Sequence, residues 1–351
     1  MDLSSLYQLV HCNGTVACAN LTDEALDAIH EYLFGGANQI HHIHVKVLLP
    51  LCVVGCVTNV VAAAFLASSS LHRSGGVRVF LLSLCVFDCL QLVFTLHMVV
   101  PDLCSQWTST PWLCSVYYRI WRLPLAHISA VIDTAHMWLI VALTAHRHWK
   151  ISQPFHSHVH DTESRVRCLI LIIFVCAVMF RVPIVFEYEM TTKNGNWVVR
   201  QTGLVQNELY RVAYHLIATT LLFNLVPFVT LTLLNFLILY TLWKARHAVR
   251  KDAVNRHREQ RAAIAICTIV SLFLAFHSLF VYELIRKLSG RNITATDKFI
   301  STISTVLSAL SATLNPLIYV AMGTGCRLCH MTIVNCVRRR GAPDMKVLYW
   351  G

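Results

Sequence analysis

Two aspartates lie inside long apolar stretches, where an ionisable side chain is costly. Asp88 sits in "LSLCVFDCLQL" and Asp133 in "LAHISAVIDTAHMW". A carboxylate surrounded by hydrocarbon needs a partner or a proton. We therefore expect both aspartates to have a function inside the membrane. For Asp133, bonding to neighbouring hydroxyls or to His136 competes evenly with ligand binding. Arg181 and Glu283 lie near the ends of similar stretches, where snorkelling to the interface is expected.

These stretches belong to a chain that is 56% hydrophobic and only 13% charged. About 20 residues of helix cross the hydrocarbon of a bilayer, and backbone groups in lipid must be paired within the helix. The uncharged or nearly uncharged runs occupy residues 47–66, 79–101, 123–145, 168–187, 213–243, 262–285 and 299–322. The sequence therefore predicts an all-α membrane protein, a seven-transmembrane helix bundle. Its divisions are an N-terminal segment at 1–45, the membrane domain at 46–322 and a C-terminal segment at 323–351.

The distribution of charge predicts the orientation of the bundle. The segments 66–78, 146–167, 244–261 and the tail from 323 hold 18 of the 29 Lys and Arg, whereas residues 1–45 hold none. Cations collect on the cytoplasmic side of membranes, so the N-terminus is expected outside the cell, at the plasma membrane. The glycosylation sequons at Asn13, Asn20 and Asn292 fall on the same outer side. Cations beside membrane spans favour anionic lipid as a partner and argue against nucleic acid.

The cysteine and histidine clusters outside the apolar runs allow several interpretations. Cys12, Cys18, Cys104 and Cys114 lie on the outer side, where disulfides form, with three possible pairings. Three cysteines beside cations follow the last run and are candidates for palmitoylation, with unmodified thiols an equal alternative: Cys326, Cys329 and Cys336. The clusters "HHIH" at 41–44 and "HSHVH" at 156–160 lack partners at metal-ligand spacing, so solvated loops and no metal site are expected.

The last apolar run contains Asn-Pro-x-x-Tyr, in "LSALSATLNPLIYVAMG". Pro316 has no N–H and weakens the helix one turn earlier, Asn315 can satisfy the freed groups, and Tyr319 follows one turn later. In the seventh of seven runs, this motif resembles the rhodopsin-like G-protein-coupled receptors. The resemblance covers residues 45 to about 337 and includes, in order, Asn59, Asp88, Arg147, Pro154, Pro227, Phe273, Asn315, Pro316 and Tyr319. The segment "GTGCRLCHMTIV" resembles the family's short amphipathic eighth helix.

The resemblance implies functions for these residues. Asn59, Asp88 and Asn315 would converge in a polar pocket that is often a sodium site, the one cofactor that the resemblance suggests. Arg147 would contact a heterotrimeric G protein when the sixth helix moves outward. Pro227 and Pro316 would permit the backbone adjustments of that motion, Tyr319 would rotate inward, and Asn235 lies near the inner end of the fifth helix. No motif supports an enzyme.

The sequence also departs from the family pattern. In "AHRHW" the acid that pairs with Arg147 is replaced by His146, and the following Tyr by His148. A neutral imidazole cannot restrain the arginine, so signalling is expected to be either constitutive or lost. The sixth run, "FLAFHSLFVYE", carries His277 where the family has Trp and lacks the nearby Pro. Residues 187–211 contain no Cys, so the common disulfide to that loop cannot form.

The ligand is indicated only indirectly. Ser129 occupies the position where amine receptors carry an Asp. "RVPIVFEYE" and the fifth run resemble invertebrate FMRFamide-type neuropeptide receptors. The arginine of such a peptide needs an acid. Asp133 and Glu283 are favoured over Glu187 and Glu189 because partial desolvation strengthens a charge pair, and His277 is a further candidate contact. A small-molecule chemoreceptor of the same fold is the alternative. A transporter or channel is disfavoured because the two halves show no repeat.

Overall fold

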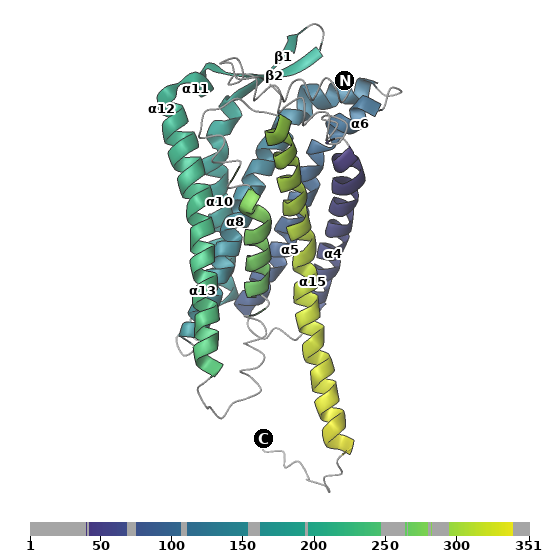
Figure 1. Cartoon of the computed structure of the whole chain (residues 1–351), viewed down its shortest axis with the longest axis vertical. Coiled ribbons are helices and arrows are strands. Elements are labelled where there is room, and N and C mark those ends of the chain that lie inside the picture. The colour runs from purple at the N-terminus through teal and green to yellow at the C-terminus, as the bar shows by residue number, and fades with distance from the viewer. Residues whose placement is uncertain are drawn as a thin grey trace, which may run out of the picture.

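The computed structural model describes residues 40, 42–68, 75–106, 111–153, 162–193, 196–246, 264, 266–279, 282 and 295–339, with the backbone alone for 319–339. These residues are almost entirely helical, and the helices form one elongated bundle (Figure 1). Of the predicted N-terminal segment 1–45, only the last residues are described.

Six described helical stretches are long and apolar enough to cross a membrane: His44–Ala67, Gly76–Cys104, Trp112–Ser152, Glu163–Phe186, Glu208–Lys244 and Thr296–Ile318. A shorter apolar helix, Ile266–Leu279, lies within the predicted sixth run and is called the sixth helix below. These helices confirm the predicted all-α membrane bundle. Most stretches extend beyond the uncharged runs, because helical hydrogen bonding continues where the side chains become polar.

The elements follow in chain order, with η1, η3 and η5 in the wide π form and η2 and η4 in the tight 3₁₀ form. They are η1 (His44–Leu48), α4 (Leu49–Ser68), α5 (Gly75–Thr95), η2 (Leu96–Met98), α6 (Val100–Gln106), α7 (Pro111–Val116), η3 (Tyr117–Trp121), α8 (Arg122–Ser152), α10 (Glu163–Arg181), η4 (Val182–Phe186), β1 (Tyr188–Lys193), β2 (Asn196–Gln201), α11 (Gly203–Gln206), α12 (Glu208–Tyr210), η5 (Arg211–Leu225), α13 (Val226–Arg246) and α15 (Ala295–Arg339).

Helix α8 is central to the packing. It contacts α5, α10 and α13, while α4 packs between α5 and α15. The main core contains Phe80, Leu84, Leu139, Ile140 and Phe273, each no more than 1% exposed. Burying such side chains fixes which face of each helix points inward, and that orientation places the polar residues described below.

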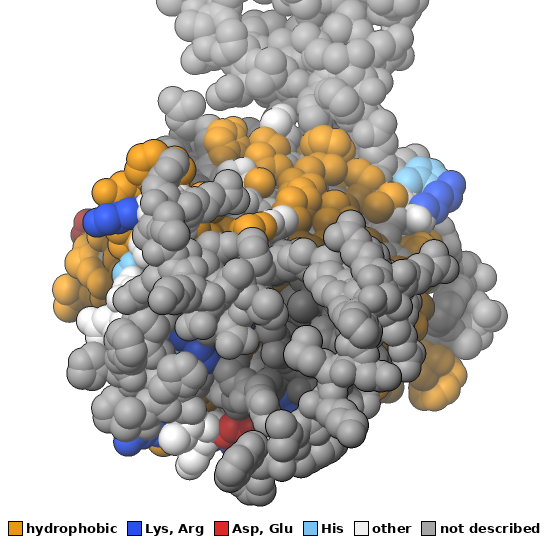
Figure 2. Space-filling model, turned by 90° about the horizontal axis from the view of Figure 1, so that it is seen from below, with side chains coloured by type: hydrophobic (Ala, Val, Ile, Leu, Met, Phe, Trp, Pro, Cys, Tyr) orange, Lys and Arg blue, Asp and Glu red, His pale blue; other side chains and the backbone are white. Residues whose placement is uncertain are grey.

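The outer faces of the helices are apolar. Leu171, Met179 and Phe236 are each more than 60% exposed. Figure 2 views the molecule from the end where the chain finishes and shows apolar side chains along the flank of the bundle. A soluble protein rarely exposes so much hydrocarbon, whereas a lipid-facing surface requires it.

Two helices differ from ordinary α-helices around their prolines. The π segment η5 ends directly before α13, whose second residue is Pro227. Within it, Thr220 Oγ1 and Asn224 Nδ2 donate to carbonyls five residues earlier, as the wide register allows. The 45-residue helix α15 runs through Pro316 and includes the segment predicted as a separate eighth helix. That segment is helical but continuous with the seventh span, since Gly323 and Gly325 permit a turn without forcing one.

A β-hairpin closes one end of the bundle and was not predicted from the sequence. Strands β1 and β2 pair antiparallel, with Tyr188 opposite Gln201 and Lys193 opposite Asn196. The Asn-Gly pair at 194–195 between two β-prone runs is the signal that could have revealed it. The hairpin lies at the upper end of Figure 1, opposite the end of α15. We call these the hairpin end and the Arg147 end.

Gly55 permits the close approach of α4 to α15 and α5. A Cβ added there would lie 2.6 Å from Leu92 Cδ1 and closer still to Thr313 Oγ1. Thr313 cannot easily retreat, because its hydroxyl donates to the carbonyl of Ala309 at 2.8 Å. The contact therefore sets the spacing of three helices.

We expect Gly55→Ala to destabilise the folded protein by about 1–3 kcal/mol, because overpacking forces the helices apart. Thermal unfolding of the purified protein measures this as a lower midpoint. Gly203→Ala is the matched control, since nothing lies within 4 Å of a Cβ built there. Equal unfolding midpoints for both variants would contradict the close-approach argument.

Candidate functional site

The three polar residues predicted to converge do lie together between α4, α5 and α15. Asp88 has no exposed surface, and Asn315 Nδ2 donates to its two carboxylate oxygens at 3.4 and 3.2 Å. Asn59 Nδ2 donates instead to the carbonyls of Gly55 and Ala312, at 2.9 and 3.0 Å. Asn59 thus ties α4 to α15, while Asn315 supplies the partner that the buried charge requires.

His136 on α8 completes this cluster, through a contact with Asp88 that the sequence did not indicate. Its Nε2 lies 2.8 Å from Asp88 Oδ1, with both side chains almost fully buried. The sequence left His136 open as one possible partner of Asp133, beside neighbouring hydroxyls and a ligand. Which aspartate the ring meets depends on how α8 is rotated against α5, and nothing in the sequence records that rotation.

The cluster does not fit a sodium ion beside Asp88. A ring nitrogen 2.8 Å from a carboxyl oxygen shares a hydrogen with it, carried by the ring or by the carboxyl, since two lone pairs at that distance repel. Asp88 therefore receives the N–H groups of Asn315 from α15 and has the His136 ring of α8 against its other side, close to Oδ1 but not in the geometry of a normal hydrogen bond. A sodium ion needs oxygen ligands and would meet these positively polarised hydrogens instead.

A cavity of about 1100 Å³ extends from the hairpin end into the bundle. Tyr188 and Gln201 of the hairpin line its upper part, and His136 and Phe273 line its deep part. Three predicted ligand contacts, Ser129, Asp133 and His277, are among its lining residues. The cavity therefore joins the hairpin end to the buried polar cluster around Asp88.

Asp133 is the accessible acid of the cavity. Its side chain is exposed to the cavity although it lies deep between helices, and Ser129 one turn earlier bonds to it. Arg181 also lines the cavity and attracts Asp133. Its Nε donates to Thr134 Oγ1 at 2.7 Å, so the expectation that Arg181 snorkels to the interface was wrong. The guanidinium turns inward because α8 offers it both a hydroxyl and a charge.

Two of the remaining candidate acids, Glu187 and Glu189, are not lining residues of the cavity. Glu187 is only 2% exposed and accepts a hydrogen bond from Tyr210 at 2.7 Å, with His215 Nε2 3.3 Å away. Burial opposes ionisation of Glu187, but the contacts from His215 and Tyr210 outweigh it, so the pKa of this carboxyl lies below its usual value. Glu189 is exposed on β1 and is not a lining residue. Glu283 lies outside the described residues.

His277 anchors the deep end of the cavity. Its Nδ1 donates to the carbonyl of Phe273 at 3.0 Å, and its ring stacks on the Phe273 ring at 3.8 Å. Its Nε2 lies 3.3 Å from Ser308 Oγ, which accepts from Gln91 Nε2 at 2.8 Å. This chain of contacts joins the sixth helix to α15 and α5. A histidine can accept as well as donate at this position, whereas the family tryptophan has a single N–H donor and no acceptor.

At the Arg147 end, the side chain of Arg147 is buried inside the bundle. Arg147 is 6% exposed, and its neighbour His146 packs its ring 5.3 Å from that of Phe80. His148 Nε2 lies 3.3 Å from Ser152 Oγ. The His146 ring thus has aromatic neighbours on α5 and on its own helix, Phe80 and Trp149.

Two further predicted residues connect helices near this end. Asn235 on α13 donates to Ser271 Oγ of the sixth helix at 3.0 Å. Phe273, two residues further along the sixth helix, lies 6.1 Å from the His136 ring in an edge contact. For Tyr319 only the backbone is described, as a residue of α15.

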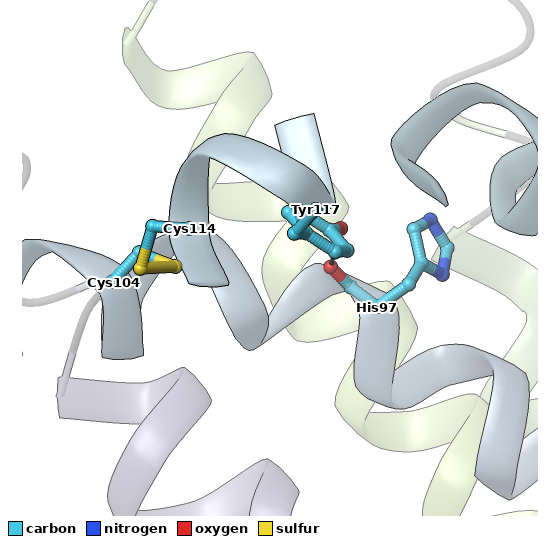
Figure 3. The surroundings of a disulfide bond; sticks show 4 residues. All are labelled: His97, Cys104, Cys114 and Tyr117. Atoms are coloured by element: carbon cyan, nitrogen blue, oxygen red, sulfur yellow. Dashed lines mark hydrogen bonds between the residues drawn. A yellow bond between two sulfur atoms is a disulfide. The ribbon is translucent and has the colours of Figure 1, made fainter. Parts of the chain in front are cut away.

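The hairpin end is tied by a disulfide and an ion pair. Cys104 and Cys114 are bonded with their Cα atoms 5.6 Å apart, joining α6 to α7. Beside them Tyr117 donates to the carbonyl of His97 at 2.8 Å (Figure 3). His44 of the "HHIH" cluster was expected in a solvated loop but is 8% exposed, with Nδ1 2.5 Å from Asp102 Oδ2. Partnering an acid explains why this histidine is buried.

Other predicted sites stay predictions. No group of three metal-ligating side chains occurs in the part of the chain that the structure describes. Cys326, Cys329 and Cys336 are described as backbone of α15 only. The following lie outside the described residues: Cys12, Cys18, Asn13, Asn20, Asn292, Pro154 and the histidines at 156–160.

A bundle of membrane-length helices with a cavity open at one end and a polar core beneath it defines the class of seven-helix receptors. Residues 58–319 match the model of the seven-transmembrane receptor, rhodopsin family, and the chain belongs to that family. Its members are receptors rather than enzymes.

Several characterised proteins resemble the chain. The FMRFamide peptide receptor frpr-18 of Caenorhabditis elegans is 28% identical over 54% of this chain and 44% of its own length. Sex peptide receptor-related protein 2 of the same nematode is 29% identical over 39% of this chain and 36% of its own length. The allatostatin-A receptor of Bombyx mori is 20% identical over 81% of this chain and 77% of its own length. The chain thus spans less than half the length of the first two.

We expect the stability of the protein to depend on ionised Glu187. A carboxyl whose folded pKa is depressed stabilises the fold above its unfolded value of 4.5, and this contribution is lost as pH falls through the lower folded pKa. Glu187→Gln should therefore lower the unfolding midpoint at pH above 5 and differ less from the wild type at acid pH. Thermal unfolding across this pH range measures the effect.

Glu189→Gln is the matched control, because Glu189 is two residues away and exposed. A pH profile of unfolding that is identical in Glu187→Gln and wild type would mean that the contacts with Tyr210 and His215 do not stabilise the charge.

Proposed function

We propose that this protein is a peptide receptor of the plasma membrane, with its N-terminus outside the cell, that activates a heterotrimeric G protein. The observation that carries the proposal is the cavity of about 1100 Å³ that leads from the hairpin end to Asp133 and His277. The printed names of two relatives, receptors for FMRFamide peptide and for allatostatin-A, support a peptide ligand. The cations that flank the helices at the Arg147 end support the orientation.

The size of the cavity favours a peptide end over a small molecule. Pockets for drug-sized ligands measure about 300–1,000 Å³, and this one exceeds that range while its upper wall is a hairpin. A β-hairpin at the mouth offers contacts to residues of a peptide that remain above the cavity. A small-molecule chemoreceptor has no comparable observation in its favour.

The charges on the cavity wall fit a ligand that carries both a cation and carbonyl groups. Asp133 is accessible and accepts hydrogen bonds, whereas Arg181 only donates them. The arginine of a peptide ending in Arg-Phe-amide would bind the carboxylate of Asp133, and the peptide carbonyls would accept from Arg181. The ligand would thus form one charge pair with Asp133 and accept hydrogen bonds from Arg181 through its neutral carbonyl groups.

Transmission to the G protein would pass along α8 and the sixth helix to the Arg147 end. The ring of His146 packs on Phe80 and supplies no negative charge next to Arg147. The resting state of Arg147 then lacks the neighbouring carboxylate that the family pattern supplies. This arrangement favours a receptor with activity in the absence of ligand.

We expect His146→Asp to lower ligand-free activity, because an adjacent carboxylate would pair with Arg147 and stabilise the resting state. A pair worth about 1 kcal/mol lowers the active fraction about fivefold. G-protein activation in cells expressing equal amounts of each receptor at the surface provides the measurement. His148→Asp is the control, since it adds the same charge where the ring contacts Ser152 instead. Unchanged activity in His146→Asp would show that the missing acid does not set the basal level.

The ligand contact is tested with Phe-Met-Arg-Phe-amide and an analogue in which norleucine replaces the arginine. In the wild type we expect the analogue to be about tenfold weaker or worse, as for loss of a partly desolvated charge pair. In Asp133→Asn both peptides should have similar, low potency, because the partner of the arginine is gone. Glu189→Gln should behave like the wild type. A response to neither peptide, or to any other amidated peptide, would instead favour the chemoreceptor.

A further inference from the structure

His136 contributes both to the wall of the cavity and to the polar cluster around Asp88. It lines the deep end of the cavity, and its Nε2 lies 2.8 Å from Asp88 Oδ1. Its ring also meets Phe273 edge-on at 6.1 Å. Only 2% of the residue is exposed, so its position is fixed by packing on several sides.

The carboxylate of Asp88 needs compensation because it has no contact with solvent. A buried charge that loses its partner costs several kcal/mol, so the partner is part of the folded structure. In the family that this chain belongs to, a diffusible cation is the expected partner. Here Oδ1 faces the His136 ring, and Asn315 Nδ2 donates to both oxygens. The Asn315 amide and the His136 ring thus fill the space directly beside the carboxyl group of Asp88.

We propose that the side chain of His136 replaces the diffusible cation of this pocket, so that the receptor carries its own attached partner for Asp88 and does not respond to sodium ions. Replacing the ion by an attached side chain affects how a signal reaches Asp88. A ligand that reaches the deep end of the cavity touches His136 directly, and any movement of the ring changes the environment of Asp88. The signal to the polar core then needs no ion to leave or enter.

The surrounding oxygens show what the imidazole displaces. On α4 and α15, which border the cluster, Asn59 Oδ1, Asn315 Oδ1 and Ser311 Oγ are buried and have no hydrogen-bond partner among the residues that the structure describes. His136 Nε2 likewise forms no hydrogen bond of normal geometry there, so its contact with Asp88 is one of close approach. Together with the carboxylate of Asp88 they are the hard oxygen ligands that a small cation prefers. Replacing His136 by serine removes the N–H group, leaves space and adds one more oxygen. The variant should therefore gain the sodium site that the wild type lacks.

The test measures thermal unfolding of purified receptor in sodium chloride and in choline chloride at equal ionic strength of about 0.15 M. The unfolding midpoint of the wild type should be the same in both salts. That of His136→Ser should be roughly 2–4 °C higher in sodium, as expected for a ligand that binds only the folded state. His277→Ser is the matched control, because His277 lines the same cavity and packs on the same Phe273. It should show no difference between the salts.

Stabilisation of the wild type by sodium would overturn the proposal whatever the variants do. A folded His136→Ser that ignores sodium would also overturn it, since the ring would not be what excludes the ion. His136→Gln keeps an N–H donor of similar length and covers the case in which the serine variant does not fold. It should stay insensitive to sodium, and a sodium response there would contradict the role of the N–H group. No ligand is needed, so the result is independent of the peptide proposal.

Discussion

The buried carboxylate of Asp88 constrains the arrangement of the helices around it. With no exposed surface, it can stay in the bundle only if neighbouring helices bring hydrogen-bond donors to it. Helix α8 brings His136 and α15 brings Asn315, while Asn59 binds α4 to α15 through the carbonyl of Ala312. The absence of a side chain at Gly55 lets these helices approach closely enough. Packing and electrostatics therefore fix the same geometry.

The same geometry couples the ligand cavity to the core. His136 is a wall of the cavity and the partner of Asp88, and Phe273 lies between the rings of His136 and His277. From there Asn235 connects α13 to the sixth helix. In this receptor, histidines stand at positions where the family has a tryptophan, an acid and a cation partner. Each of these histidines contacts a neighbouring residue: His136 contacts Asp88, His146 contacts Phe80 and His277 contacts Phe273. The structure therefore accommodates these departures from the family pattern.

How far the site could be read from the sequence differs from residue to residue. Asn59, Asp88 and Asn315 were placed together because each belongs to a motif with a fixed position on its helix. Arg181 was misjudged and the contact of His136 with Asp88 was not foreseen, because these partners are set by helix rotation and by side-chain direction rather than by spacing. Glu187 looked equivalent to Glu189 in the sequence. The fold buries one beneath Tyr210 and His215 and leaves the other exposed on the hairpin.

The sequence by itself determined the number, order and approximate limits of the membrane helices. Hydropathy is a property of consecutive residues. An apolar stretch long enough to cross the bilayer forms a membrane-spanning helix whatever the rest of the chain contains. Only the tertiary structure decided which polar side chains meet: His136 with Asp88, Arg181 with Thr134 and His44 with Asp102. Such pairs depend on the rotation and depth of two helices at once. That relation is set by the packing of all the side chains between them, which no local stretch of sequence contains.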